Sequence, residues 1–436
     1  MAYSLEVVYG QQVIGQLNQH IDTGLLELSY SQRWQETGFA ISPALTFEKH
    51  DKAAAYNFLD NLLPEGEARK LLSQDIGVNE KQVFPQVKAI GNDLCGAFSF
   101  LAEQVSSDKA IFREIEEKEL IHRLDHKEDI GLLQWDEKPR LSVAGVQDKL
   151  NVFVNEHDEI GLADGTLSST YILKFERKNC ANLVINEYFC MKLSQLVGLP
   201  TSEVTLKRFS KHPALCVKRF DRKYDATSNR VLRRHVIDGC QALNLPRDYK
   251  YERNLGDGRD VKHIRDGASL EKLFNFCRQS SEPIANMQWL INWQLFNLLI
   301  SNYDSHGKNV SFFYGANESV FTPAYDIVNV AMFDQFKHTL AMAMGDEFEP
   351  DTINAYQLAD FADTCQLDRK LVSRMLIKLA AKVLKILAEN TILAELEKES
   401  VISQQETNYL NQVSEHIERR TIHLLEQADE IALIEL

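Results

Sequence analysis

The segment 299–326 constrains this chain more than any other, because it places three side chains that bind protons or cations at fixed spacings after an apolar run. Asp304 and Asn309 are five positions apart in a polar stretch that follows the apolar residues 295–300, and Asp326 ends a second short apolar run. The first Asp can accept a proton from a hydroxyl group, while an amide oxygen and a second carboxylate suit a hard divalent cation. This order of side chains indicates phosphoryl transfer.

The spacing D-x-x-x-x-N with a downstream Asp is typical of a protein-kinase catalytic loop and its metal ligand. A structural alternative exists, because a cluster of Asn, Asp and Ser after an apolar helix often forms only a turn, and the pattern recurs by chance in long chains. The second acid and a lysine on a predicted strand, described below, favour the catalytic interpretation.

The chain has 436 residues, of which 44% are hydrophobic, so we expect two or three globular domains. Lys and Arg total 48 against 63 for Asp and Glu, which gives a formal charge of −15. This acidity argues against a uniform, sequence-independent nucleic-acid surface, although a local basic patch stays open. The best candidates for such a patch lie on the outer faces of predicted C-terminal helices, where solvation is the simpler explanation: Lys378, Lys382, Lys385, Arg419 and Arg420.

The seven cysteines are scattered and include no C-x-x-C pair, so neither a disulfide framework nor a zinc knuckle is indicated. No window reaches the roughly 18 uncharged apolar residues of a membrane span, and the first residues lack the basic and apolar regions of a signal peptide. We therefore expect a cytoplasmic protein that does not bind membranes.

Hydrophobic periodicity predicts a β-rich first half and a helical second half. Short alternating runs in 3–30 predict a small sheet, and residues 52–63 and 83–90 have helical spacing. The mixed-charge run 103–130 is typical of a solvated helix face. Pro246 and a glycine-rich loop precede the helical part. We predict an N-terminal subdomain at 1–105, a nucleotide-binding lobe at 106–250 and a helical lobe at 251–436.

The segment 171–176 is a predicted strand whose alternation places Lys174 on the face opposite its aromatic side chains. A lysine at the centre of a strand is costly to bury unless it meets an anion. Kinases place their nucleotide-phosphate lysine in this way and pair it with a glutamate on the next helix, for which Glu187 is the candidate. The alternative is an edge-strand lysine that reaches water.

The segment 140–149 resembles a phosphate-binding turn only weakly. Gly145 would allow backbone N–H groups to approach phosphate oxygens and Lys149 supplies a charge, but the three glycines of a kinase loop are missing. An ordinary hairpin turn is the alternative.

Together, these motifs resemble the HipA-type serine/threonine kinases, the toxin halves of bacterial toxin–antitoxin pairs. The similarity runs nearly from end to end and rests on FLDNLLP at 58–64, IGNDLCGA at 90–97, LSVAGVQDK at 141–149, ILK at 172–174, NEY at 186–188, RFDR at 219–222, DSHGKN at 304–309 and YDI at 325–327. It implies an α+β, bilobal protein-kinase-like fold with a β-rich N-terminal lobe, an extra N-terminal subdomain and an all-α C-terminal lobe.

The resemblance also implies roles for single residues. Asp304 matches the catalytic base, Asn309 and Asp326 match the Mg²⁺ ligands, and Lys174 matches the lysine that contacts the ATP phosphates. Further nucleotide-binding positions are the phosphate loop Ala144, Gly145, Val146, Gln147, Asp148 and Lys149, the hinge Lys218, Arg219 and Phe220, and His306, Lys308 and Tyr325. Lys218 stands where an acid is common in the family, which puts a side-chain contact with ribose in doubt.

Ser142 falls on the position that these kinases phosphorylate on themselves, which silences them. A phosphate group there would compete for the backbone amides that hold ATP, or would displace the loop.

The resemblance implies ATP and Mg²⁺ as cofactors, a protein substrate for which the translation machinery is one source, and a HipB-like helix-turn-helix antitoxin dimer that brings the chain to operator DNA and co-represses the operon. A small-molecule kinase of the lipid or antibiotic type and a non-catalytic co-repressor are the alternatives. The first would not label its own Ser142, and the second would not hydrolyse ATP.

Overall fold

The computed structural model describes residues 2–48, 51–102, 109–127, 132, 134–136, 138–139, 148–177 and 179–435. The chain forms two compact units, each built from several segments. The first unit contains Met1–Glu176, Arg208–Arg247 and Ser311–Ser319, and the second contains Arg177–Lys207, Asp248–Val310 and Val320–Leu436. The division into three domains at 105 and 250 stays a prediction.

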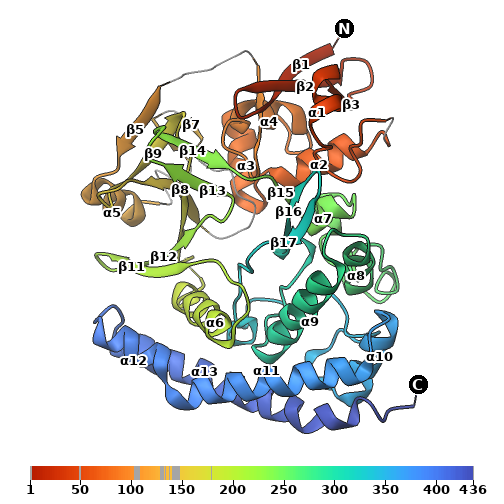
Figure 1. Ribbon diagram of the computed structural model, residues 1–436. Coiled ribbons are helices and arrows are strands. Elements are labelled where there is room, and N and C mark those ends of the chain that lie inside the picture. The colour runs from red at the N-terminus through yellow and green to blue at the C-terminus, as the bar shows by residue number, and fades with distance from the viewer. Residues whose placement is uncertain are drawn as a thin grey trace. The chain divides into compact units, whose positions relative to one another are not determined.

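The first unit begins with the predicted small sheet, which has four strands in the order β3-β2-β1-β4. Its strands are β1 Ala2–Tyr9, β2 Gln12–His20, β3 Leu26–Tyr30 and β4 Phe98–Leu101. Leu5 and Val7 on β1 are two positions apart and both buried, as period-2 alternation requires, and Ile14 and Leu17 on β2 are also buried. The helices that accompany the sheet are α1 Gln32–Thr37, α2 Ala54–Leu62, α3 Gly66–Asp75 and α4 Val83–Ile90 (Figure 1).

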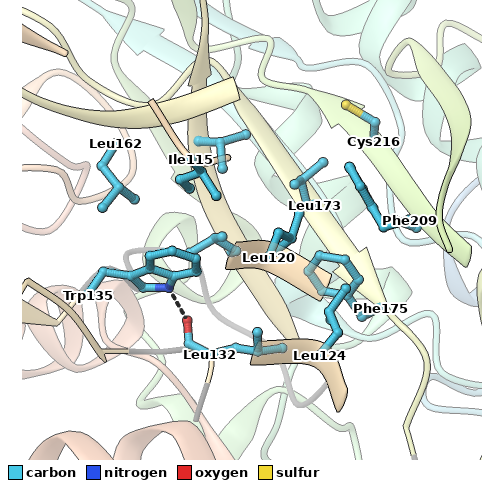
Figure 2. Packing of buried hydrophobic residues seen from close by; sticks show 13 residues of the cluster. Ile115, Leu120, Leu124, Leu132, Trp135, Leu162, Leu173, Phe175, Phe209 and Cys216 are labelled. Atoms are coloured by element: carbon cyan, nitrogen blue, oxygen red, sulfur yellow. Dashed lines mark hydrogen bonds between the residues drawn. The ribbon is translucent and has the colours of Figure 1, made fainter. Parts of the chain in front are cut away.

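A six-stranded sheet with the order β11-β12-β10-β8-β9-β5 carries the lysine strand. Its strands are β5 Ala110–Glu114, β8 Lys149–Val154, β9 Ile160–Gly165, β10 Tyr171–Phe175, β11 Val204–Phe209 and β12 His212–Lys218. One face packs on helix α5 Glu117–Asp125 and on Trp135, whose indole N–H donates to the carbonyl of Leu132 at 2.9 Å (Figure 2).

The mixed-charge run differs in part from its prediction. It contains the expected helix α5, with Leu120 and Leu124 buried against the sheet, but residues 110–114 form strand β5, paired with β9. Phe112 packs edge-on against Phe153 at 5.8 Å between ring centroids. Pairing with a neighbouring strand outweighed the charged composition.

Shorter strands and one short helix complete the first unit. A hairpin joins β13 Arg222–Asp225 to β14 Arg230–Arg233, and a further sheet has the order β15-β16-β17. The remaining elements are β6 Gln134–Trp135, β7 Lys138–Pro139, β15 Val236–Asp238, β16 Ser311–Gly315, β17 Glu318–Phe321 and α7 Gly239–Ala242.

The second unit is predominantly helical. Its helices are α6 Leu183–Val197, α8 Leu270–Arg278, α9 Pro283–Leu299, α10 Ala355–Thr364, α11 Arg369–Glu389, α12 Thr391–Lys398 and α13 Gln404–Gln427. Helix α9 is buried over most of its length, as its apolar composition predicts, and α11 packs along α13 (Figure 1). None of the described helices is long and apolar enough to cross a membrane.

Two of the basic side chains that we predict to be solvated form hydrogen bonds within the protein instead. The ammonium group of Lys382 donates to the carbonyl of Val197 at 2.6 Å, and the Arg420 guanidinium donates to the carbonyl of Pro350 at 2.5 Å. Both side chains reach carbonyl groups that no local sequence pattern reveals, so they tie helices α11 and α13 to neighbouring chain segments.

Candidate active site

The end of helix α9 positions Asp304. Ser301 adopts a positive φ of 58°, which ends the helix, and Asn302 turns back so that its backbone N–H donates to the Asn297 carbonyl at 2.8 Å. The side-chain nitrogen of Asn302 also donates to Oδ1 of Asn297 at 2.8 Å, and its Oδ1 accepts the Asp304 N–H at 3.3 Å. The segment that carries the predicted base therefore begins from a buried and hydrogen-bonded turn.

Asp304 and Asn309 are joined directly. The side-chain nitrogen of Asn309 donates to the Asp304 carbonyl at 2.8 Å, across a short 3-10 turn at Gly307–Asn309. The backbone N–H of His306 donates to the same carbonyl at 2.8 Å. Because the Asn309 nitrogen is used in this bond, the amide oxygen is the atom that can serve a cation.

His306 and Lys308, which we predict to contact ATP, are both buried within this loop. The phenol of Tyr325 donates to the carbonyl of Lys308 at 2.8 Å. Tyr325 therefore links the segment that carries Asp326 to the loop that carries Asn309.

Asp326 has a φ of 57°, in the left-handed region that Asp tolerates better than most residues. Its segment is fixed on both sides, since Ala324 forms a bridge with Thr201 and the N–H of Val330 donates to the Ser301 carbonyl at 3.0 Å. These contacts hold the two predicted metal-binding segments to the same part of the second unit.

The donor set fits Mg²⁺. The Asn309 amide oxygen and the Asp326 carboxylate are hard oxygen ligands, and Mg²⁺ commonly takes only one or two carboxylates from the protein and the rest from phosphate and water. The described residues contain no group of three or more His, Cys, Asp or Glu that could hold a metal alone.

In the first unit, Lys174 lies on β10 and faces away from the hydrophobic core that Leu173 and Phe175 join, as the alternation predicts. Its direct neighbour across the antiparallel pair with β8 is Lys149, and both side chains are buried. Residues opposite each other project from the same face of a sheet. Two predicted phosphate-binding lysines therefore lie side by side.

The adjoining loop is described only at its end. The carboxylate of Asp148 accepts from the ammonium group of Lys127 at 2.8 Å, and the Asp148 carbonyl accepts from the Phe175 N–H at 2.8 Å. The other predicted loop positions, Ala144, Gly145, Val146 and Gln147, and the predicted phosphorylation site Ser142 lie outside the described residues.

The predicted hinge 218–220 follows strand β12 and contains a buried ion network. Arg219 binds both carboxylate oxygens of Asp221 at 2.9 Å and donates to the Ser169 hydroxyl at 2.9 Å. Asp221 also accepts from Arg222 at 2.6 Å and from the N–H of Gly96 at 3.1 Å. The guanidinium of Arg219 is thus committed within the protein, and its backbone N–H donates to the Thr170 carbonyl at 2.9 Å, so a nucleotide contact at this position would use the Arg219 carbonyl.

Burial disfavours the charged form of Asp221, but the attraction of Arg219 and Arg222 outweighs it and holds the pKa of Asp221 well below its ordinary value. Asp221 is therefore ionised at neutral pH. The pair of Lys174 with Glu187 stays a prediction, because the buried Glu187 lies on α6 in the second unit.

One feature of the site was not predicted. The Tyr251 phenol donates to Oδ1 of Asp304 at 2.7 Å. The two residues are 53 positions apart in the chain, and no local pattern reveals the contact.

Comparison with known proteins gives first the fold class of this chain and then its family. The chain has an α+β, protein-kinase-like fold: a chain of a solved complex, described as the toxin–antitoxin proteins HipA and HipB of Shewanella oneidensis MR-1 with operator DNA, superposes with a TM-score of 0.90 at 38% identity. The superposition covers 99% of this chain and 100% of the other. Residues 5–101 match the HipA N-terminal domain, and residues 141–387 match the HipA-like C-terminal domain.

A Shewanella oneidensis protein named serine/threonine-protein kinase toxin HipA is 41% identical over 387 residues, which are 88% of this chain and 89% of that protein. The chain belongs to the HipA family.

Proposed function

We propose that this protein is an Mg²⁺- and ATP-dependent serine/threonine kinase that serves as the toxin of a toxin–antitoxin pair. The observation that carries the proposal is the hydrogen bond from the Asn309 side chain to the Asp304 carbonyl, which fixes a base and a cation ligand in one turn. The 41% identical relative named as a kinase toxin supports the same activity.

In this mechanism, Asp304 orients the substrate hydroxyl and accepts its proton as the γ-phosphoryl group is transferred. Asn309 and Asp326 would hold Mg²⁺, which offsets phosphate charge when bound. Lys149 and Lys174 bind phosphate oxygens, and His306 and Lys308 add donors from the catalytic loop. The hinge 218–220 pairs with adenine through backbone groups.

Ser142 is the proposed site of self-phosphorylation. A phosphate group at this position carries nearly two negative charges and competes with ATP for the donors of residues 143–149. The modified protein would therefore be inactive.

The proposed partner is a HipB-like helix-turn-helix antitoxin dimer, which supplies the base contacts to operator DNA while this chain co-represses. The solved complex of a relative with its antitoxin and operator DNA supports this role. The substrate of the free toxin is a protein, with the translation machinery as one source. Both activities belong in the cytoplasm.

Radiolabelled ATP with Mg²⁺ tests the proposal. We expect phosphate on Ser142, located by mass spectrometry, in the wild-type chain and none in Asp304→Asn. A folded wild-type chain that binds ATP but labels neither itself nor any protein substrate would contradict kinase activity toward proteins, and labelling of a lipid or antibiotic instead would favour a small-molecule kinase.

A further inference from the structure

Tyr251 contacts two residues of one loop: Asp304, the predicted base, and His306. Its hydroxyl donates to Oδ1 of Asp304 at 2.7 Å, and its ring packs edge-on against His306, with 5.1 Å between centroids and 88° between planes. Tyr251 is 38% exposed, so it reaches the solvent-accessible surface while making both contacts.

The backbone on either side of Tyr251 is fixed to the catalytic loop. The Lys250 carbonyl accepts the Gly307 N–H at 2.9 Å, and the Glu252 N–H donates to Ala341 at 3.0 Å. Ala341 in turn donates to the Tyr303 carbonyl at 3.0 Å. The position of the phenol relative to Asp304 is therefore set by backbone hydrogen bonds, as a preorganised site requires.

A second layer supports this segment. Glu252 is buried. Its carboxylate accepts a hydrogen bond from Arg265 at 2.6 Å and another from the Ala343 N–H at 2.8 Å. Gly267 packs so closely that a Cβ atom there would lie 1.8 Å from the Tyr251 carbonyl. These contacts restrain the backbone of the segment that carries Tyr251.

We infer that Tyr251 is a positioning residue for phosphoryl transfer, which holds one oxygen of Asp304 so that the other oxygen faces the substrate hydroxyl. This inference rests on the proposed kinase function. A carboxylate with two equivalent oxygens can rotate, and a donor on one of them selects a single orientation.

The test compares the wild-type chain with Tyr251→Phe, which keeps the ring against His306 and removes only the hydroxyl. Self-labelling rates are measured over a range of ATP concentrations, which separates the rate at saturating ATP from the affinity for ATP. We expect the rate at saturating ATP to fall about tenfold. Affinity for ATP should change less than about twofold, because the hydroxyl contacts Asp304 and not a phosphate-binding group.

Tyr356→Phe is the matched control. Tyr356 is an exposed tyrosine on α10 of the same unit, and its side chain has no role in the proposed site. Its variant should keep the wild-type rate and the wild-type affinity for ATP. Tyr251→Ala, which also loses the contact with His306, should lose more than about tenfold in rate, and thermal unfolding checks that each variant is folded.

Two results would overturn the inference while leaving the kinase function intact: Tyr251→Phe with the wild-type rate at saturating ATP, or Tyr251→Phe with a faster rate. The second result would mean that the phenol competes with the substrate hydroxyl for Asp304. A wild-type chain that transfers no phosphate would instead overturn the kinase function, and the positioning role with it.

Discussion

Lys149 and Lys174 lie opposite each other on neighbouring antiparallel strands, and both side chains are buried. Like charges in this arrangement repel, and burial of an ammonium group is costly unless anionic groups compensate it. A sheet that keeps two lysines in register on one face is suited to a ligand with several negative charges. The polyphosphate of ATP has that chemistry.

Replacement of either lysine by Met should therefore weaken ATP binding. We expect a loss of about tenfold or more in affinity for each variant, or about 1.4 kcal/mol, seen as a smaller rise in melting temperature on addition of Mg-ATP. Lys378→Met removes an exposed lysine from α11 and is the control. Equal stabilisation by ATP in wild-type, Lys149→Met and Lys174→Met would exclude both lysines from the nucleotide site.

Asp304→Asn tests the base without changing the shape of the side chain. The backbone carbonyl that Asn309 and His306 bind is unaffected, so the loop should keep its structure. Phosphoryl transfer should fall by about 10²- to 10⁴-fold, while ATP affinity stays close to that of the wild type. The measurement is the labelling rate beside a nucleotide-binding titration. A variant with undiminished labelling would show that another group accepts the proton.

Much of this site follows from the sequence because its information is local. The five-residue spacing of Asp304 and Asn309 specifies one hydrogen-bonded turn, and the alternation around Lys174 specifies a face of a strand. The pairing of Lys149 with Lys174 is different, because register depends on contacts between separate strands. Sequence alone predicts a phosphate-binding role for each lysine but does not predict that they lie side by side.

The features that the sequence does not predict depend on contacts between distant parts of the chain. Strand β5 was hidden in a charged run because its pairing with β9 is set by tertiary structure. Arg219 is predicted to be a hinge residue, and the ion network that its guanidinium forms with Asp221 and Ser169 is not part of that prediction. Such contacts bring together residues that are distant in the chain, so no short pattern encodes them.

Asp326→Asn should separate the metal role from the backbone role of this residue. Asn tolerates a φ of 57° as well as Asp does, so the backbone conformation at this position should be retained. Loss of the carboxylate should lower phosphoryl transfer by about 10²-fold or more and raise the Mg²⁺ concentration needed for half-maximal rate.

Asp334→Asn removes an exposed acid from the same unit and is the control for the change in charge. An unchanged Mg²⁺ requirement in Asp326→Asn would remove this residue from the metal site.

Asp221→Asn should destabilise the first unit strongly. The change leaves the buried guanidinium groups of Arg219 and Arg222 without their carboxylate, which costs about 3–5 kcal/mol in comparable buried pairs. Asp22→Asn changes an exposed acid and should have no comparable effect. Urea unfolding measures both.

The ion network also predicts that the free energy of unfolding decreases in acid solution. The pKa of Asp221 is lowered in the folded chain, so its contribution is complete above the ordinary Asp pKa of about 4 and is lost as the pH falls below that value. Asp221→Asn should show a flatter decline in the free energy of unfolding below about pH 4. If the free energy of unfolding depended on pH in the same way in the wild type and in Asp221→Asn, the role of Asp221 in that decline would be contradicted.

His235 should make the first unit less stable in mildly acidic solution. Burial lowers its pKa to about 4, against the weaker opposing effects of its hydrogen bond to the Ile41 carbonyl and of the charge on Asp221. The unfolded chain binds a proton here at about pH 6.5 and the folded chain does not, so stability is complete above that pH and is lost as the pH falls toward 4. The loss should approach about 3 kcal/mol at pH 4.

His235→Gln removes the titrating group and keeps a side-chain donor for Ile41, so its free energy of unfolding should vary less between about pH 6.5 and pH 4 than that of the wild type. His157→Gln, at an exposed histidine of the same unit, should retain the wild-type pH dependence. Because Asp221 titrates below this range, the two groups are distinguished by pH alone. A His235→Gln curve that follows the wild type through this interval would show that His235 binds its proton equally well in the folded and unfolded chains.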